Sequence, residues 1–139
     1  MMIVDKIKII LVDDNKIFNE GLNVILSKCP NYYILDSCGS GLELLECPHL
    51  HKADIILLDI QMPLMNDLEV AKKINIKYPY IKMLALSMHI DKVFLEDIIE
   101  AGFNGFIYKP DTSKKINEVI PRIMNCQFVF PDNLKLKTK

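Results

Sequence analysis

The sequence predicts a single α/β domain with a doubly wound, parallel sheet of five strands. Short apolar runs alternate with longer segments whose apolar residues recur at helical spacing, as expected of repeated strand–helix units. Several of the short runs are almost uninterrupted, which is typical of strands that helices cover on both faces. The chain has 139 residues, 50% of them hydrophobic, and this suits one domain with a core of ordinary size.

Five segments predict β-strands, because each is a short apolar run with the composition of a strand. Nearly unbroken apolar runs indicate strands buried on both faces, whereas a half-exposed antiparallel strand would alternate, so a parallel central sheet is favoured. In chain order, the predicted strands lie at residues 6–12, 32–38, 54–59, 82–87 and 105–108.

The segments between and after these strands predict helices that pack on the sheet. Pro30 supplies a stop signal for the first helix and Gly102 for the fourth. The second, third and fifth helices are marked by apolar residues within 42–45, 68–74 and 116–123. The buried stripe is expected to contain Ile17, Phe18, Leu22, Ile25 and Leu26 in the first helix, and Val93, Phe94, Ile98 and Ala101 in the fourth.

The composition excludes several classes of function. With 25% charged residues and a formal net charge of −1, the chain carries no basic footprint for DNA or RNA. Its apolar runs are far shorter than the roughly 20 residues of a membrane helix, and its N-terminus lacks a signal-peptide cleavage pattern. Four cysteines show neither a CxxC pair nor metal-ligand spacing, so reduced thiols in a cytoplasmic protein are expected; they are Cys29, Cys38, Cys47 and Cys126.

Polar residues whose side chains could take part in chemistry occur where the predicted strands end. Asp13 and Asp14 follow the first strand, and Asp59 ends the third. Ser87 ends the fourth strand and Lys109 follows the fifth. Because the carboxyl ends of parallel strands share one edge, where ligands bind, these five residues are expected to converge.

The convergence of three carboxylates calls for a cation, because the acids would otherwise repel one another and raise one another's pKa. A few oxygen ligands suit Mg²⁺, which keeps several waters and shares its shell with phosphate oxygens. Asp59 is the central acid, and a carboxylate can attack phosphorus to form an acyl phosphate. Lys109 would neutralise charge on the other side. The structural alternative for Asp13 and Asp14 is that they only cap a helix.

Four motifs at these strand ends resemble those of the CheY-like receiver domain of response regulators. They are LVDDN at 11–15, LLDIQMP at 57–63, LALSMH at 84–89 and AGFNGFIYKP at 101–110. The resemblance covers about residues 6–127. It implies a flavodoxin-like (βα)5 domain with the parallel strand order 2-1-3-4-5.

The resemblance also implies how the acidic residues act. Asp59 would accept a phosphoryl group from a sensor histidine kinase. Asp13 and Asp14, together with Asp59 and the backbone carbonyl of Gln61, would bind Mg²⁺. The protein would then be a phosphorelay switch and not an enzyme that turns over a separate substrate, since it would catalyse at most its own phosphorylation and dephosphorylation.

Further residues match the family's switch. Ser87 and Lys109 would contact the phosphoryl group, and Phe106 would be the aromatic residue whose rotamer reports the switch. Lys109–Pro110 would be a cis peptide bond, which is inexpensive only before proline. The face formed by the fourth helix, the fifth strand and the fifth helix would change, and would bind an output domain or a second copy in a homodimer.

Within the family, the chain is most similar to NarL/LuxR-type receivers. The similarity lies in DDNKIFNEGL at 13–22, in LSMH, and in the ending NCQFVFPDNL. In that subfamily a helix-turn-helix domain follows, so DNA would be contacted only through such an output domain, in transcription regulation. We expect a receiver domain at 1–127, and at 128–139 a polar tail or the start of a linker to an output domain. The chain would be either the receiver of a longer regulator or a stand-alone one.

Two residues depart from the family pattern. Asp67 stands where the family usually has a glycine in a tight turn, so a left-handed backbone is expected there, and its carboxylate adds charge near the metal site. Met88 stands where many receivers carry a small residue, and its long side chain could slow access to Asp59. Both are expected to tune metal affinity and reaction rate.

Two other functions compete with the switch. A Mg²⁺-dependent phosphatase of the haloacid-dehalogenase type would carry a DxD motif on its first strand, whereas here Asp13 and Asp14 are adjacent. A pseudo-receiver that only binds partners would suit Asp67 and Met88 if these residues block the chemistry.

Overall fold

The computed structural model describes residues 6–61 and 65–131 of the chain. These residues form a five-stranded parallel sheet with the order β2-β1-β3-β4-β5. The predicted fold class and strand order are therefore confirmed, and the strands begin and end within one residue of their predicted bounds. The strands are β1 (Ile7–Val12), β2 (Tyr32–Cys38), β3 (Ile55–Asp59), β4 (Lys82–Ser87) and β5 (Gly105–Tyr108).

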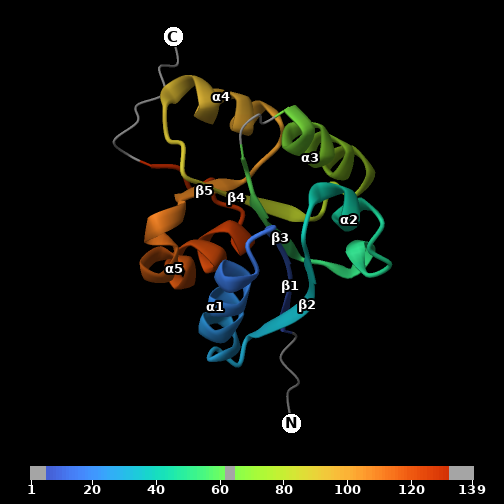
Figure 1. Ribbon diagram of the computed structural model, residues 1–139, viewed down its shortest axis with the longest axis vertical. Coiled ribbons are helices and arrows are strands. Elements are labelled where there is room, and N and C mark those ends of the chain that lie inside the picture. Colours follow the sequence, from blue (N-terminus) through green and yellow to red (C-terminus); the bar gives the residue numbers. More distant parts are fainter. Residues whose placement is uncertain (1–5, 62–64, 132–139) are drawn as a thin grey trace.

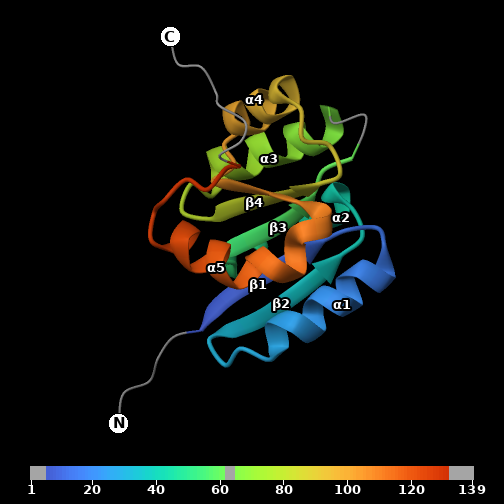
Figure 2. The same cartoon turned by 90° about the vertical axis from the view of Figure 1, so that its left-hand side faces the viewer.

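Helices cover both faces of the sheet, with α1 and α5 on one side and α2, α3 and α4 on the other (Figures 1 and 2). The longest of them have 13 residues, and in the two described ranges no helix is long and apolar enough to span a membrane. The helices are α1 (Lys16–Ser27), α2 (Gly41–Leu45), α3 (Met65–Lys77), α4 (Lys92–Glu100) and α5 (Thr112–Met124), with 3-10 turns at Leu50–Lys52 and Lys109–Asp111.

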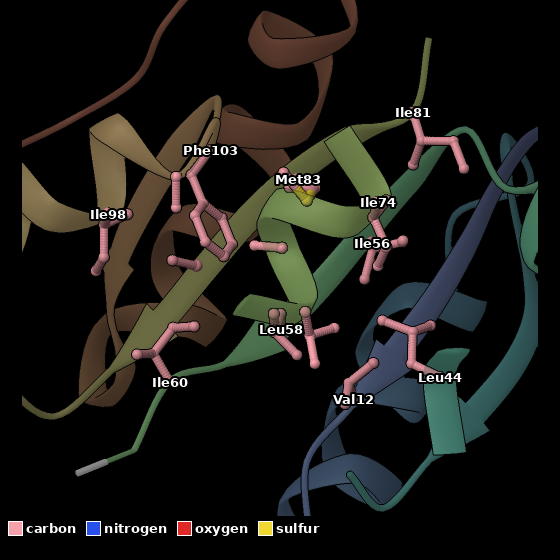
Figure 3. Close-up of a cluster of buried hydrophobic side chains, with 14 of the residues drawn as sticks. Val12, Leu44, Ile56, Leu58, Ile60, Ile74, Ile81, Met83, Ile98 and Phe103 are labelled. Atoms are coloured by element: carbon pink, nitrogen blue, oxygen red, sulfur yellow. The ribbon is translucent and has the colours of Figure 1, made fainter. Parts of the chain in front are cut away.

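The central strands β1 and β3 are buried on both faces, which explains their unbroken apolar sequences. Ile10 and Ile56 belong to the core under α2, α3 and α4, whereas Ile9 and Ile55 belong to the core under α1 and α5. Figure 3 shows the first of these cores, in which Ile56 lies among side chains from β4 and α3. Full burial of one such aliphatic side chain contributes roughly 1.5–3 kcal/mol, so the two cores hold the sheet rigidly beneath the strand ends.

Helices α1, α2 and α4 begin with a side-chain cap close to the carboxyl end of a strand. The Asn15 side chain accepts a hydrogen bond from the Phe18 N–H, at 3.1 Å. Ser40 caps α2 and Asp91 caps α4 in the same way. Since each cap satisfies an otherwise unpaired backbone N–H, it fixes where the helix starts and therefore the short loop before it.

Two residues assigned to buried stripes are instead exposed, so these predictions are wrong. Ile17 is 81% exposed and Val93 is 68% exposed. The buried face of α1 follows Leu22 and Leu26, four residues apart, with Phe18 one turn earlier. Ile17 lies about 100° around the helix from Phe18, which turns its side chain to solvent. Val93 likewise lies one residue before the buried Phe94 of α4, so its side chain also turns to solvent.

The chain stays packed beyond residue 127, where we predicted that the domain ends. Val129 is buried and pairs in parallel with Gly105 of β5. The Phe106 N–H donates to the Val129 carbonyl at 2.9 Å, and the Val129 N–H donates to the Asn104 carbonyl at 3.0 Å. Val129 thus forms a single bridge beside β5, outside the five strands of the sheet. Residues 132–139 lie outside the described ranges, and a linker there stays a prediction.

We predict that Gly102→Ala lowers the free energy of unfolding by about 1–2 kcal/mol. Gly102 ends α4 with φ +103°, and its N–H and that of Phe103 bond back to the carbonyls of Ile99 and Ile98. A methyl group there would also approach the Asn75 side chain to 2.7 Å. Urea denaturation measures the change. Gly21→Ala is the matched control: Gly21 lies within α1 with open space around it, so alanine should add about 0.5–1 kcal/mol. Equal effects of the two substitutions would contradict the left-handed end of α4.

Candidate functional site

The carboxyl ends of β1, β3 and β5 bring two buried carboxylates and one ammonium into contact. Lys109 Nζ lies 2.8 Å from Asp13 Oδ2 and 3.2 Å from Asp59 Oδ1. Asp14 joins them, since one oxygen from each of the three aspartates lies within 4.8 Å of the others. The structure therefore brings together the three acids and the lysine that we expected to converge at this edge of the sheet.

Asp13 is held rigidly by its neighbours on the loop into α1. Its Oδ1 accepts a hydrogen bond from the Asn15 N–H at 2.8 Å, and its backbone carbonyl accepts one from the Asn19 side chain at 3.0 Å. Burial raises the pKa of the Asp13 carboxyl, and the bonds from Lys109 and Asn15 only partly oppose this. The nearby charge of Asp59 raises the pKa further. Asp13 is thus a carboxylate in a setting that disfavours its negative charge.

Lys109 is the positive counterpart of this cluster. Burial by itself would lower the pKa of the ammonium, but Asp13 and Asp59 outweigh that effect, and the pKa of Lys109 is raised. Its ammonium also lies 4.5 Å from the centre of the Phe18 ring, a cation–π contact that sequence reasoning missed. One ammonium faces several carboxylates, so negative charge remains in excess.

Gln61 enters the site through its side chain. Its Nε2 donates to Asp59 Oδ2 at 2.6 Å and to Asp14 Oδ1 at 2.9 Å, so the amide bridges two of the acids. The resemblance to receiver domains implied a role for the backbone carbonyl of Gln61 instead, and that role stays a prediction. The backbone N–H of Gln61 donates to Asp67 Oδ2 at 3.0 Å. Sequence spacing gives no signal for either side-chain contact, because both depend on the course of the loop after β3.

Asp67 does not adopt the left-handed turn that we predicted for it. It lies in the first turn of α3, and Cys126 is the one non-glycine residue with positive φ in the part of the chain that the structure describes. A carboxylate in a first turn interacts favourably with the helix dipole. Burial nevertheless raises the pKa of Asp67, the Gln61 N–H opposes this, and the charges of Asp59 and Asp14 add to it.

The acids line an open cavity of about 140 Å³, roughly the volume of four or five water molecules. The cavity suits a small hydrated cation, because its donors are carboxylate oxygens and its charge is negative. The oxygen Asp13 Oδ2 also favours a cation. Among the residues that the structure describes, it is the buried side-chain oxygen or nitrogen without a well-aligned hydrogen bond. Its partner is the ammonium of Lys109, with which it forms an ion pair. The lining residues are Val12, Asp13, Asp14, Gly39, Ser40, Gly41, Asp59, Gln61 and Asp67.

Ser87 and Met88 lie on the opposite side of Asp59. Ser87 is fully buried, and its hydroxyl accepts a hydrogen bond from the His89 N–H at 3.1 Å. This bond holds the loop between β4 and α4. Met88 is 56% exposed and borders, with His89 and Lys109, a second hollow that reaches Asp59. The Met88 side chain thus borders an opening that reaches Asp59, and its effect on access stays a prediction.

Phe106 points into the core. It is 3% exposed, and its ring meets that of Phe94 edge-on, with 6.4 Å between the ring centres. Phe94 belongs to α4, so this contact joins β5 to that helix. Lys109 and Pro110 open the 3-10 turn after β5, and the cis form of their peptide bond stays a prediction.

Comparison with known proteins identifies the class. Residues 9–121 match the family model of the response regulator receiver domain, and the chain belongs to this family. It is 30% identical over 128 residues to the transcriptional regulatory protein LnrK of Bacillus subtilis, covering 92% of this chain and 58% of LnrK. It is 29% identical over 116 residues to the transcriptional regulatory protein DegU of Brevibacillus brevis, covering 84% of this chain and 49% of DegU. The chain thus spans only about half the length of these relatives.

Solved structures agree with this assignment. The receiver domain of a putative response regulator NarL from Mycobacterium tuberculosis superposes with a TM-score of 0.78 at 25% identity, over 87% of this chain and 98% of that one. A LuxR-family response regulator from Aurantimonas sp. shares the fold with a TM-score of 0.83 at 22% identity, over 94% and 93% of the two chains. The predicted receiver class and its NarL/LuxR-type resemblance are confirmed. The protein is a receiver domain of two-component response regulators, and neither the phosphatase nor the pseudo-receiver is favoured.

We predict that Asp67→Asn raises the free energy of unfolding at pH 7 without magnesium, by a few tenths to about 1 kcal/mol. Asparagine keeps an oxygen to accept the Gln61 N–H but removes a charge that the site disfavours. Because the pKa of Asp67 is raised in the folded state, its ionisation costs stability as the pH rises above 3.8. The gain should therefore shrink as the pH falls from 7 toward 4. Urea denaturation at several pH values measures it, and Asp67→Ala, which also loses the acceptor, should be less stable than Asp67→Asn. An unchanged gain at low pH would contradict the electrostatic origin.

Proposed function

We propose that Asp59 is the phospho-acceptor of this receiver domain. The supporting observation is its setting: the Asp59 side chain is 4% exposed, with Lys109 at one oxygen and Gln61 at the other, between two openings to solvent. One Asp59 oxygen would attack the phosphorus of a phosphohistidine on a sensor kinase. The new O–P bond would form as the P–N bond breaks, and the imidazole would leave.

The same cluster fits the magnesium ion that receiver domains use. Asp13, Asp14 and Asp59 would hold Mg²⁺, with the carbonyl of Gln61 as a further ligand. When bound, the ion would neutralise charge on the phosphoryl oxygens. Because the Gln61 amide now bridges Asp14 and Asp59, it would have to release these carboxylates to the metal. Asp67 would hold the Gln61 backbone in place and add negative charge beside the metal ligands.

Phosphorylation would act by changing which contacts are favourable at the site. Lys109 would exchange part of its pairing with Asp59 for a phosphoryl oxygen. Ser87 would give up the His89 N–H to hydrogen-bond the same group, and this would free the loop before α4. Phe106 would follow by changing its rotamer against Phe94. Met88, at the mouth, would slow the approach of donor and water to Asp59.

The output of the switch would pass through the face formed by α4, β5 and α5. An output domain or a second copy of the chain would bind there, and DNA would be reached only through an output domain. Val129 already pairs with Gly105 of β5, so a linker after it would leave the domain beside this face. The names of DegU and LnrK as transcriptional regulatory proteins support such an output. A receiver that takes its phosphoryl group from a sensor kinase in this way would work in the cytoplasm.

We predict that the protein gains one phosphoryl group when incubated with acetyl phosphate and Mg²⁺, as measured by intact mass. Asp59→Asn should abolish the gain, because an amide is no nucleophile toward phosphorus. Asp97→Asn removes an exposed carboxylate on α4 and should leave the gain unchanged. A folded wild-type protein that gains no mass would indicate a pseudo-receiver. Steady turnover of a small phosphate ester would indicate a phosphatase.

We predict that magnesium stabilises the protein through the acidic cluster. A concentration 100 times the dissociation constant should add about 2.7 kcal/mol to the free energy of unfolding. Asp14→Asn should remove most of this gain while leaving the fold intact, since Asp14 is exposed. Thermal unfolding at increasing Mg²⁺ measures the effect, with Asp97→Asn as the control. Equal stabilisation of wild type and Asp14→Asn would place the metal elsewhere.

A further inference from the structure

A second cluster of metal-binding side chains lies beside the acidic site. Asp36 and Cys38 are two residues apart on β2, so their side chains share one face of the sheet. The short helix α2 turns the chain back and brings Cys47 to the same place. One ligand atom from each of the three residues lies within 4.8 Å of the other two. The Cys47 thiol donates a hydrogen bond to Asp36 Oδ2 at 3.1 Å.

We propose that Asp36, Cys38 and Cys47 form a binding site for a thiophilic divalent cation, of which Zn²⁺ is the natural probe. In a tetrahedral site with Zn–S bonds of about 2.3 Å, two sulfurs lie roughly 3.8 Å apart, and a sulfur and an oxygen roughly 3.6 Å apart. The Cys47–Asp36 separation of 3.1 Å is about half an ångström shorter than this, and the other two separations are at most 4.8 Å. Small side-chain adjustments would therefore complete three ligands, with water as the fourth.

The protonation balance of the site is simple. A bound Zn²⁺ would form two Zn–S bonds, and the Cys38 and Cys47 thiols would release two protons to solvent. Loss of the Cys47 proton would also break its hydrogen bond with Asp36, which frees that carboxylate oxygen to become the third ligand. Cys38 is 5% exposed while Cys47 is half-buried, so the cation could enter from the Cys47 side.

The competing role for two neighbouring cysteines is oxidation to a disulfide. Burial and then the charge of Asp36 raise the pKa of the Cys38 thiol to about 12. Burial and the hydrogen bond to Asp36 likewise raise the pKa of Cys47. Since the thiolate is the form that reacts with peroxide, these raised pKa values disfavour oxidation at this pair. A strongly binding cation can still displace their protons.

The position of the cluster links it to the receiver chemistry. The carbonyl of Cys38 accepts the backbone N–H of Asp13 at 3.0 Å. Residues 39–41, directly after Cys38, line the acidic cavity. A cation bound to Asp36, Cys38 and Cys47 would join the end of β2 to the residues after α2. It would thereby restrain residues 39–41, which line the acidic cavity. The site itself is independent of the proposed phosphorylation of Asp59.

Cobalt binding tests the site, because Co²⁺ occupies zinc sites and its bonds to thiolates absorb in the near ultraviolet. The reduced full chain, in excess Mg²⁺ to occupy the acidic cluster, should bind one equivalent of Co²⁺ with thiolate charge-transfer absorption, and Zn²⁺ should displace it. Cys38→Ser and Cys47→Ser should abolish the absorption, and Asp36→Asn should weaken binding at least tenfold. The double variant Cys29→Ser/Cys126→Ser removes the two cysteines outside the cluster and should bind as wild type.

Thermal unfolding gives a second measure, since Zn²⁺ should raise the melting temperature of wild type but not of Cys47→Ser. If Cys38→Ser fails to fold because it is buried, then Cys47→Ser and Asp36→Asn decide the outcome. Absence of charge-transfer absorption in folded wild type would overturn the proposal. So would absorption that survives in Cys47→Ser, or binding that is lost in Asp14→Asn and therefore belongs to the acidic cluster.

Discussion

An excess of negative charge at the ends of β1 and β3 is the constraint on which the site depends. Asp13 and Asp59 share the ammonium of Lys109, while Asp14 and Asp67 add further carboxylates at the same cavity. A chain free to relax would separate these charges, but the parallel sheet and its two cores prevent this. Holding these like charges together disfavours their ionised forms, and in the function proposed above it would keep the acids in place for a cation and a phosphoryl group.

Contacts from this site reach α4 in two short steps. The hydroxyl of Ser87 is bonded to the backbone of the loop before α4, and the ring of Phe106 packs against Phe94 within that helix. The Ser87 hydroxyl and the Phe106 ring are both buried, so a change in either would require its neighbours to repack. In the proposed switch, these two contacts would transmit a change at Asp59 to α4.

The fold could be predicted closely because β1 and β3 are buried on both faces, and a strand buried on both faces has an unbroken apolar sequence. The acids and Lys109 could be placed because parallel strands end at one edge. Three features could not be predicted from the sequence. The contacts of the Gln61 side chain and the helical backbone of Asp67 depend on the path of a loop. The exposure of Ile17 depends on its angular position on the helix. The cluster of Asp36, Cys38 and Cys47 could not be predicted for the same reason. Cys47 reaches β2 because the chain turns back through α2, and the spacing of these residues in the sequence does not show this.

The pairing of Val129 with β5 has a consequence for how the molecule behaves in a crowded solution. A strand at the border of a sheet exposes a row of amides and carbonyls that can recruit strands from other molecules. Here the Phe106 amide and the Asn104 carbonyl are already satisfied by Val129. A fragment cut at residue 127 would leave these groups open, and we would expect it to self-associate more readily. By pairing with these groups, Val129 would thus make association through the edge of β5 less favourable.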